Sequence, residues 1–187
     1  RTAGFGNAGF QGANSIAVRE PSVHWSGTKA LFSMVIGAPT QQVPVATFRW
    51  QNYEVTNLGE NQTPVVTKVP NQPANFNNIS PIYGSDGRIL FTSDLPRNLD
   101  PSMSPQLDEY ESDATNTGIW SMKANGTGLK LLDHAPSGAF TPTIDSFGRL
   151  LFTRWDHLQR DQQADADAED PGTYGTFDFS DESAAAL

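Results

Sequence analysis

Short apolar runs, separated by polar turn residues, recur along the chain. Ile89-Leu-Phe91 and Leu150-Leu-Phe152 each follow a Gly-Arg pair, and neither lies within a 3.6-residue apolar stripe of the kind that marks an amphipathic helix. Apolar runs this short, bounded by turns, are typical of β-strands. We therefore predict an all-β chain in which these two runs are inner strands covered on both faces.

One pattern occurs three times. A Pro is followed six residues later by a Gly, and then by an apolar run that ends in Phe and a Ser or Thr. The prolines lie 60 and 61 positions apart, and the Pro–Gly pairs are Pro21 and Gly27, Pro81 and Gly87, and Pro142 and Gly148. The pattern predicts three β-hairpins: a short strand ends near Pro, Gly adopts a backbone angle that other residues resist, and a buried strand returns. Asp86-Gly87 is the strongest single turn signal.

A second pattern has the same period. An aromatic residue precedes a Gly by six positions in Tyr53–Gly59 and in Trp120–Gly126, and a further strand pattern follows each, at 64–69 and 129–132. Each repeat thus contains about four strands, which is the content of one β-propeller blade. We predict an all-β fold: a partial β-propeller of about two and a half four-stranded blades with a long acidic C-terminal loop or tail.

The repeat also predicts how the chain is organised. The segments are an irregular Gly-rich lead (1–15), a first blade (16–69), a second blade (70–133), the start of a third (134–160) and the acidic tail or loop (161–187). The second blade has a long insertion at 94–118, and loops of this length are usually functional or disordered. Since propellers close with about four to eight blades, we expect other repeats or other polypeptides to complete the ring. The opening at Arg1, without Met or a signal peptide, also suggests a segment of a longer chain.

The repeat resembles that of TolB-like β-propellers. Within that group, the motifs at Ser80–Asp94 and Phe152–His157 resemble the propeller domain of hydrazine-synthase alpha-type proteins. The resemblance implies a periplasmic or extracellular location. It also implies that any haem lies outside this chain, which contains no Cys-x-x-Cys-His motif.

Composition narrows the classes of function. The chain has no Cys, which excludes disulfides, thiolate metal sites and a cysteine nucleophile. Its net charge of −9 is concentrated: eight acids and no Lys or Arg lie between Asp161 and Glu182, leaving 13 acids against 12 bases elsewhere. We therefore expect no nucleic-acid partner, because nothing builds a basic surface. No apolar run is long enough to predict a membrane span.

Acidic residues in the tail form a candidate calcium site. Carboxylates at nearly alternate positions can share a hard cation, and they are Asp165, Asp167, Glu169 and Asp170. The EF-hand spacing is not met, since its Gly position holds Asp170 and its twelfth position holds Thr176. A solvated acidic loop is the alternative, and we predict no other cofactor.

Two further clusters are candidate partner-binding surfaces. They are Asp108, Glu109, Tyr110 and Glu111 in the insertion, and Trp155, Asp156 and His157 after the third repeat. The insertion carboxylates could serve acid–base chemistry, but no partner base or nucleophile is identifiable and no Gly-x-Ser-x-Gly elbow occurs. We interpret His24 and His134 as turn or edge residues. The four Trp residues are interpreted as blade packing, with a carbohydrate platform as the alternative.

Our leading hypothesis is a non-catalytic propeller module for protein–protein interaction or scaffolding within a larger extracytoplasmic protein or complex. Its partners would be another protein or the remaining blades of the parent chain. The alternative is the propeller portion of a redox (multihaem) or hydrolytic enzyme, with its catalytic residues and cofactors outside this chain. A calcium-stabilised adhesion segment is a third possibility.

Overall fold

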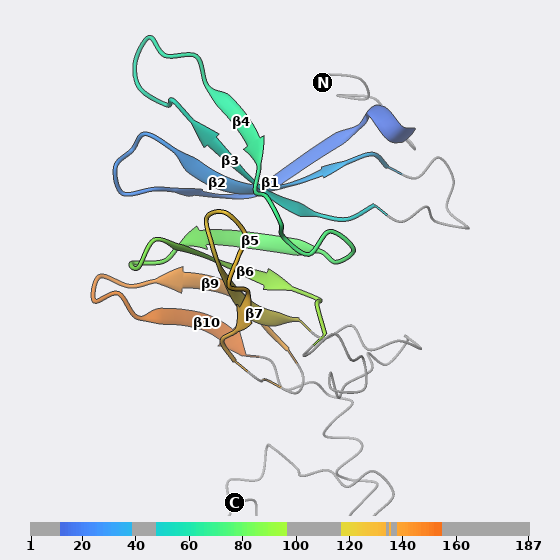
Figure 1. The fold of residues 1–187 in the computed structure, drawn as a ribbon, viewed down its shortest axis with the longest axis vertical. Helices are drawn as coiled ribbons and strands as arrows, with labels where there is room; N and C mark the ends of the chain where they lie inside the picture. Colours follow the sequence, from blue (N-terminus) through green and yellow to red (C-terminus); the bar gives the residue numbers. More distant parts are fainter. Residues whose placement is uncertain (1–11, 39–47, 97–116, 134, 136–137, 155–187) are drawn as a thin grey trace, which may run out of the picture.

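The described part of the chain folds into three antiparallel β-sheets with almost no helix (Figure 1). The computed structural model describes residues 12–38, 48–96, 117–133, 135 and 138–154. The prediction of an all-β chain is confirmed. Most of the predicted insertion at 94–118, namely 97–116, lies outside the described residues, as do residues 155–187, which include the predicted acidic tail at 161–187.

Each sheet is built from strands consecutive in sequence. The first sheet has the order β1 (Ile16–Val23), β2 (Ala30–Ile36), β3 (Gln51–Thr56) and β4 (Val65–Lys68), preceded by a 3-10 turn at Gly12–Asn14. The second sheet has β5 (Asn78–Tyr83), β6 (Arg88–Ser93), β7 (Gly118–Lys123) and β8 (Lys130–Leu131). In the third sheet, the described residues form β9 (Ala139–Ile144) and β10 (Leu150–Arg154).

The prediction that each first strand ends near its proline is confirmed, since the strands end two residues after it, at Val23, Tyr83 and Ile144. The sequence did not predict the bulge that each strand forms there. The strand continues past Pro21, Pro81 and Pro142, and a β-bulge forms at the Pro. The residue before each Pro has a positive φ: 55° at Glu20, 50° at Ser80 and 56° at Thr141. Proline has no N–H to donate, and it is tolerated in strands at edges and bulges. β1, β5 and β9 are edge strands of their sheets, so each strand accommodates its Pro.

The bulge also explains the repeated Phe. In each sheet two residues of the first strand, the bulge residue and the Pro, stand opposite one residue of the second strand. Register places Phe32, Phe91 and Phe152 at that opposing position. The three hairpins therefore repeat in backbone detail as well as in sequence.

The core lies between the first and second sheets. Its largest members come from the second sheet, where Phe91 and Trp120 face each other across β6 and β7. The cluster comprises Leu31, Val69, Tyr83, Ile89, Phe91, Leu95, Trp120 and Met122. Each buried side chain of this size stabilises the fold by about 1.5–3 kcal/mol. These residues hold the second sheet against the first.

The other face of the second sheet is covered by the third. Leu90 and Ile119 alternate with the core residues along their strands, so they point to the opposite face, where β9 packs against β5, β6 and β7. Ile89–Phe91 is thus covered on both faces, as predicted. The same prediction is wrong for Leu150–Phe152, since Leu151 is 50% exposed and Phe152 38%.

The connection between the first two sheets is held by side-chain amides. Gln72 Oε1 accepts the N–H of Asn52 at 2.7 Å, and Gln72 Nε2 donates to the carbonyl of Asn52 at 2.9 Å. Gln51 Nε2 donates to the carbonyl of Phe76 at 2.9 Å. These bonds satisfy backbone groups that strand pairing leaves free, and they fix the second sheet relative to the first.

Candidate functional site

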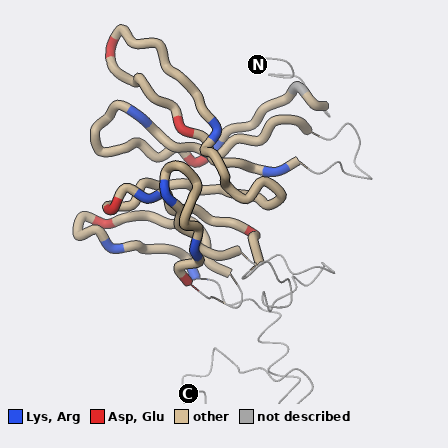
Figure 2. Tube along the Cα trace, viewed as in Figure 1, with Lys and Arg blue, Asp and Glu red and all other residues tan. Residues whose placement is uncertain are grey.

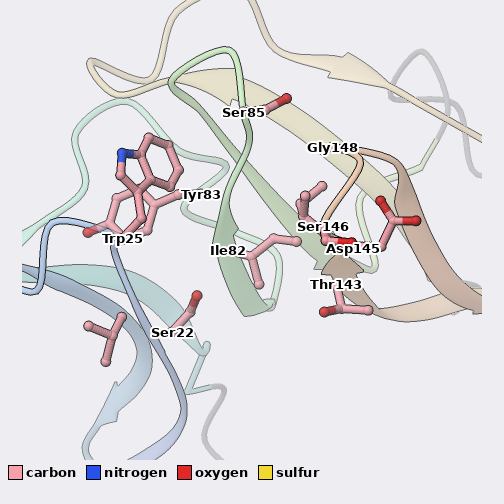
Figure 3. A pocket seen from close by; sticks show the side chains of 11 residues that line it. Ser22, Trp25, Ile82, Tyr83, Ser85, Thr143, Asp145, Ser146 and Gly148 are labelled. Atoms are coloured by element: carbon pink, nitrogen blue, oxygen red, sulfur yellow. The ribbon is translucent and has the colours of Figure 1, made fainter.

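The turns of the three repeated hairpins lie on the same side of the molecule, at the left of Figure 1, and line one pocket (Figure 3). Its volume is about 640 Å³. Each of the three hairpins supplies residues, which are Ser22, Val23 and Trp25, then Ile82, Tyr83 and Ser85, and finally Thr143, Ile144, Asp145, Ser146 and Gly148. The pocket is therefore a product of the repeat, built from equivalent positions of three sheets.

The turns have the geometry that their sequences predict. Gly27, Gly87 and Gly148 have φ of 70°, 77° and 78°, a region that side-chain-bearing residues adopt at a cost. Each donates its N–H to the carbonyl three residues earlier, at 2.8–3.0 Å. A Cβ on Gly148 would lie 3.5 Å from Ser85 Oγ, so the second and third turns are in contact.

Aromatic rings form one flank of the pocket. The Trp25 ring packs against His24 with centroids 3.9 Å apart and the planes tilted by 34°, and His24 makes a T-shaped contact with Tyr83 at 4.8 Å. His24 Nδ1 and Ser26 Oγ are hydrogen-bonded at 2.8 Å, which holds the imidazole in place. The indole of Trp25 is nevertheless 68% exposed. The prediction that Trp25 packs within a blade is therefore wrong, whereas Trp120 is buried as expected.

Tyr83 is anchored beneath this flank. Its hydroxyl donates to Glu54 Oε1 at 2.9 Å, and Lys29 Nζ donates to the same oxygen at 2.9 Å while lying 4.9 Å from the Tyr83 ring centroid. Burial, together with the adjacent Glu54 carboxylate, raises the pKa of the Tyr83 phenol well above its usual value of 10. Tyr83 is therefore neutral at physiological pH, and it acts as a fixed wall and not as a base.

Asp145 occupies the opposite flank in Figure 3, and it is fully engaged in its own turn. Its Oδ1 accepts the N–H groups of Arg149 and Phe147, both at 2.9 Å, and its Oδ2 accepts from the Arg149 guanidinium at 2.7 Å. The backbone N–H of Arg149 is the main cause that lowers the pKa of the Asp145 carboxyl, with the Arg149 side chain and the Phe147 N–H adding to it. The carboxylate of Asp145 thus stabilises the turn.

A second pocket, of about 600 Å³, lies on the face of the first sheet that points away from the second. Its lining combines apolar strand residues with two cations, and comprises Met34, Ile36, Phe48, Arg49, Gln51, Tyr53, Lys68, Ala74 and Asn75. Phe32 and Tyr53 stack on this face with centroids 5.9 Å apart. The equivalent face of the second sheet packs against the first sheet. On the first sheet this face has no neighbouring sheet among the described residues, and the pocket lies there.

The site residues predicted from sequence all lie outside the described residues. This holds for the calcium candidates Asp165, Asp167, Glu169 and Asp170, and for the partner candidates Asp108, Glu109, Tyr110, Glu111, Trp155, Asp156 and His157. Within the ranges that the structure describes, no cluster of three His, Asp or Glu could hold a metal ion. None of the described segments is a helix of the length and hydrophobicity that a membrane crossing needs.

The three-hairpin pocket was not predicted from sequence. The usable signal was the repeat itself, because turns at equivalent positions of adjacent sheets must lie at the same end. His24 was predicted to occupy a turn, and it does. The sequence could not show how much of Trp25 remains exposed.

No protein family matches the chain in a scan of family signatures, and no curated protein matches it significantly. Function is therefore inferred from the residues and their geometry.

Proposed function

We propose that the chain is part of a β-propeller that serves as a non-catalytic scaffold or protein-binding module within a larger extracytoplasmic protein. The observation that supports this proposal most is that neighbouring elements do not cover the three sheets equally. The second sheet is buried on both faces, whereas the first and third each leave apolar residues open. Val18 on β1 is 55% exposed and Leu151 on β10 is 50% exposed. Extended apolar faces are normally covered by a further element or a partner.

The spacing of the sheets also supports a radial arrangement. β5 packs against β1, β2 and β3, and β9 packs against β5, β6 and β7, while the outermost strands β4 and β8 take no comparable part. The first strand of each following sheet thus packs across the inner three strands of the sheet before it, while β4 points away from the second sheet in Figure 1. Blades around a common axis have this arrangement.

The resemblance of the Pro–Gly–Phe repeat to TolB-like propellers is the basis for the extracytoplasmic location. The chemistry of the three-hairpin pocket favours recognition over catalysis. Its two candidate acid–base groups are committed to structure, Tyr83 to Glu54 and Asp145 to Arg149. A general base needs a free lone pair directed at a substrate.

Cysteine labelling tests the proposal cleanly, because the chain has no native Cys. Val18→Cys and Leu151→Cys report on the two open faces. Their reaction with a maleimide is compared in this chain and in the longest natural polypeptide that contains it. Val65→Cys, on the exposed strand β4, and Met122→Cys, in the core, are the reactive and protected controls.

We expect both test positions to react rapidly in the isolated chain and at least about tenfold more slowly in the longer protein, as further sheets cover them. The controls should not change between the two. Equal reactivity of Val18→Cys and Leu151→Cys in both forms would contradict the radial arrangement, and with it the scaffold role.

A further inference from the structure

Four hydroxyl groups in the three-hairpin pocket form no hydrogen bond with the described part of the chain. They are contributed by all three hairpins: Ser22, Ser85, Thr143 and Ser146. A hydroxyl can both donate and accept, and its proton rotates to suit the partner. The pocket therefore offers several unused donors and acceptors, from strand residues Ser22 and Thr143 and from turn residues Ser85 and Ser146.

An exposed and immobilised indole stands beside these hydroxyls. Trp25 is backed by His24 at 3.9 Å, and His24 is itself held by Ser26 and by the Tyr83 ring. Trp25 thus packs against His24 and is nevertheless 68% exposed beside the pocket, and Tyr83 lies 6.4 Å away at 74° to it. When a ligand stacks on Trp25, the protein therefore loses little further side-chain entropy.

The charged groups around the pocket are neutralised in pairs. Asp145 is paired with Arg149 at 2.7 Å, and beneath Tyr83 the Lys29 ammonium is paired with Glu54 at 2.9 Å. Figure 2 shows acidic and basic residues interspersed over the described part of the chain, without a surface of one sign near the hairpin turns. Asp145 is the only charged residue among the described ones that line the pocket, and it is paired with Arg149, so the lining suits a neutral ligand.

We propose that the three-hairpin pocket binds a neutral carbohydrate. The apolar C–H face of a sugar ring stacks on Trp25, since these weakly positive hydrogens meet the negative face of the indole. Its hydroxyls then pair with Ser22, Ser85, Thr143 and Ser146, which match them in donating and accepting. The volume of about 640 Å³ is that of pockets that hold small ligands. This activity is separate from the scaffold role and does not require further sheets.

The experiment titrates the full chain with maltotriose, cellotriose and triacetylchitotriose, which are all neutral, and follows the Trp Nε1–H signals by NMR. The Trp25 signal is assigned by its loss in Trp25→Phe, and the buried Trp120 is the internal reference. At least one trisaccharide should shift the Trp25 signal and leave Trp120 unchanged. Binding by the variants is measured by isothermal titration calorimetry, because Trp25→Ala lacks the Trp25 signal. Trp25→Ala should weaken binding at least about tenfold, and Ser85→Ala with Ser146→Ala roughly fivefold to a hundredfold, as expected for two lost hydrogen bonds.

Phe147→Ala is the matched control. Phe147 is 82% exposed on the third hairpin but does not line the pocket, so this variant should bind like the parent. Decaproline is titrated in parallel, because an exposed Trp beside a Tyr is also the chemistry of proline-rich peptide recognition. A Trp25 shift with decaproline and with none of the sugars would replace carbohydrate by an extended peptide. The absence of any shift with all four probes would also overturn the proposal.

Discussion

The carboxylate of Glu20 accepts a hydrogen bond from the backbone N–H of Ser80, with 2.6 Å between Oε2 and N. Both residues occupy the bulge position before a repeat proline, on the first strands of neighbouring sheets. A bulge leaves a backbone group outside the ladder, and here the carboxylate of the adjacent sheet satisfies it. The two bulges are therefore joined directly, and the bond links the first sheet to the second.

Glu20→Ala should destabilise the chain by about 1–3 kcal/mol, since it leaves the buried Ser80 N–H without an acceptor. Glu20→Gln keeps an acceptor oxygen and should cost less. The measurement is urea unfolding followed by far-UV circular dichroism. Glu60→Ala, in the exposed segment between β3 and β4, is the control. If Glu20→Ala lowered the free energy of unfolding no more than Glu60→Ala does, the role of this bond would be contradicted.

Gly126→Ala should be much more damaging than Gly87→Ala. Both glycines have φ of 77°, so both variants incur the same backbone strain of about 1–2 kcal/mol. A Cβ on Gly87 meets nothing within 4 Å, whereas one on Gly126 would lie 1.9 Å from the carbonyl oxygen of Pro70. The clash should add about 1–3 kcal/mol. Unfolding free energies of the two variants give the difference, and equal losses would mean that the contact between this turn and Pro70 does not form.

Stability should fall in alkali because of Tyr83. Its pKa is raised in the folded state, so the contribution of the neutral phenol is complete below the unfolded pKa of 10 and is lost as pH rises above that value. Tyr83→Phe should unfold with a weaker dependence on pH between about 9 and 11. Unfolding titrations at these pH values measure it. Ionisation of Tyr83 near pH 10 in the folded chain, seen as phenolate absorbance that Tyr83→Phe removes, would contradict the prediction.

Asp145 should make the third hairpin sensitive to acid. Its pKa is lowered in the folded state, so its contribution is present above the unfolded pKa of about 4 and is lost as pH falls through the folded value. Asp145→Asn should weaken the turn at neutral pH and remove part of the loss of stability below pH about 4. Amide hydrogen exchange at Phe147 and Arg149 checks this locally. Unchanged protection of both amides in the variant would count against it.

Features that depend on neighbouring residues could be predicted from the sequence. The hairpin turns follow from Gly at fixed positions, and the strands follow from short apolar runs, because both depend on neighbours within a few residues. Gly27, Gly87 and Gly148 adopt the predicted left-handed angles, and strands occur where the second repeat pattern places them, at β3, β4, β7 and β8. The bulges were missed because Pro alone does not reveal whether a strand stops or continues as an edge strand.

The sequence by itself determined that this chain forms repeated antiparallel hairpins, since period and turn chemistry are local properties. Only the tertiary structure decided that Glu20 reaches Ser80, that Trp25 stays exposed beside four free hydroxyls, and that Phe91 is buried while its equivalent Phe152 is partly open. The physical reason is that burial depends on what packs against a strand. Identical motifs at Phe91 and Phe152 meet different neighbours, because strands flank β6 on both sides and, among the described residues, β10 pairs with β9 alone.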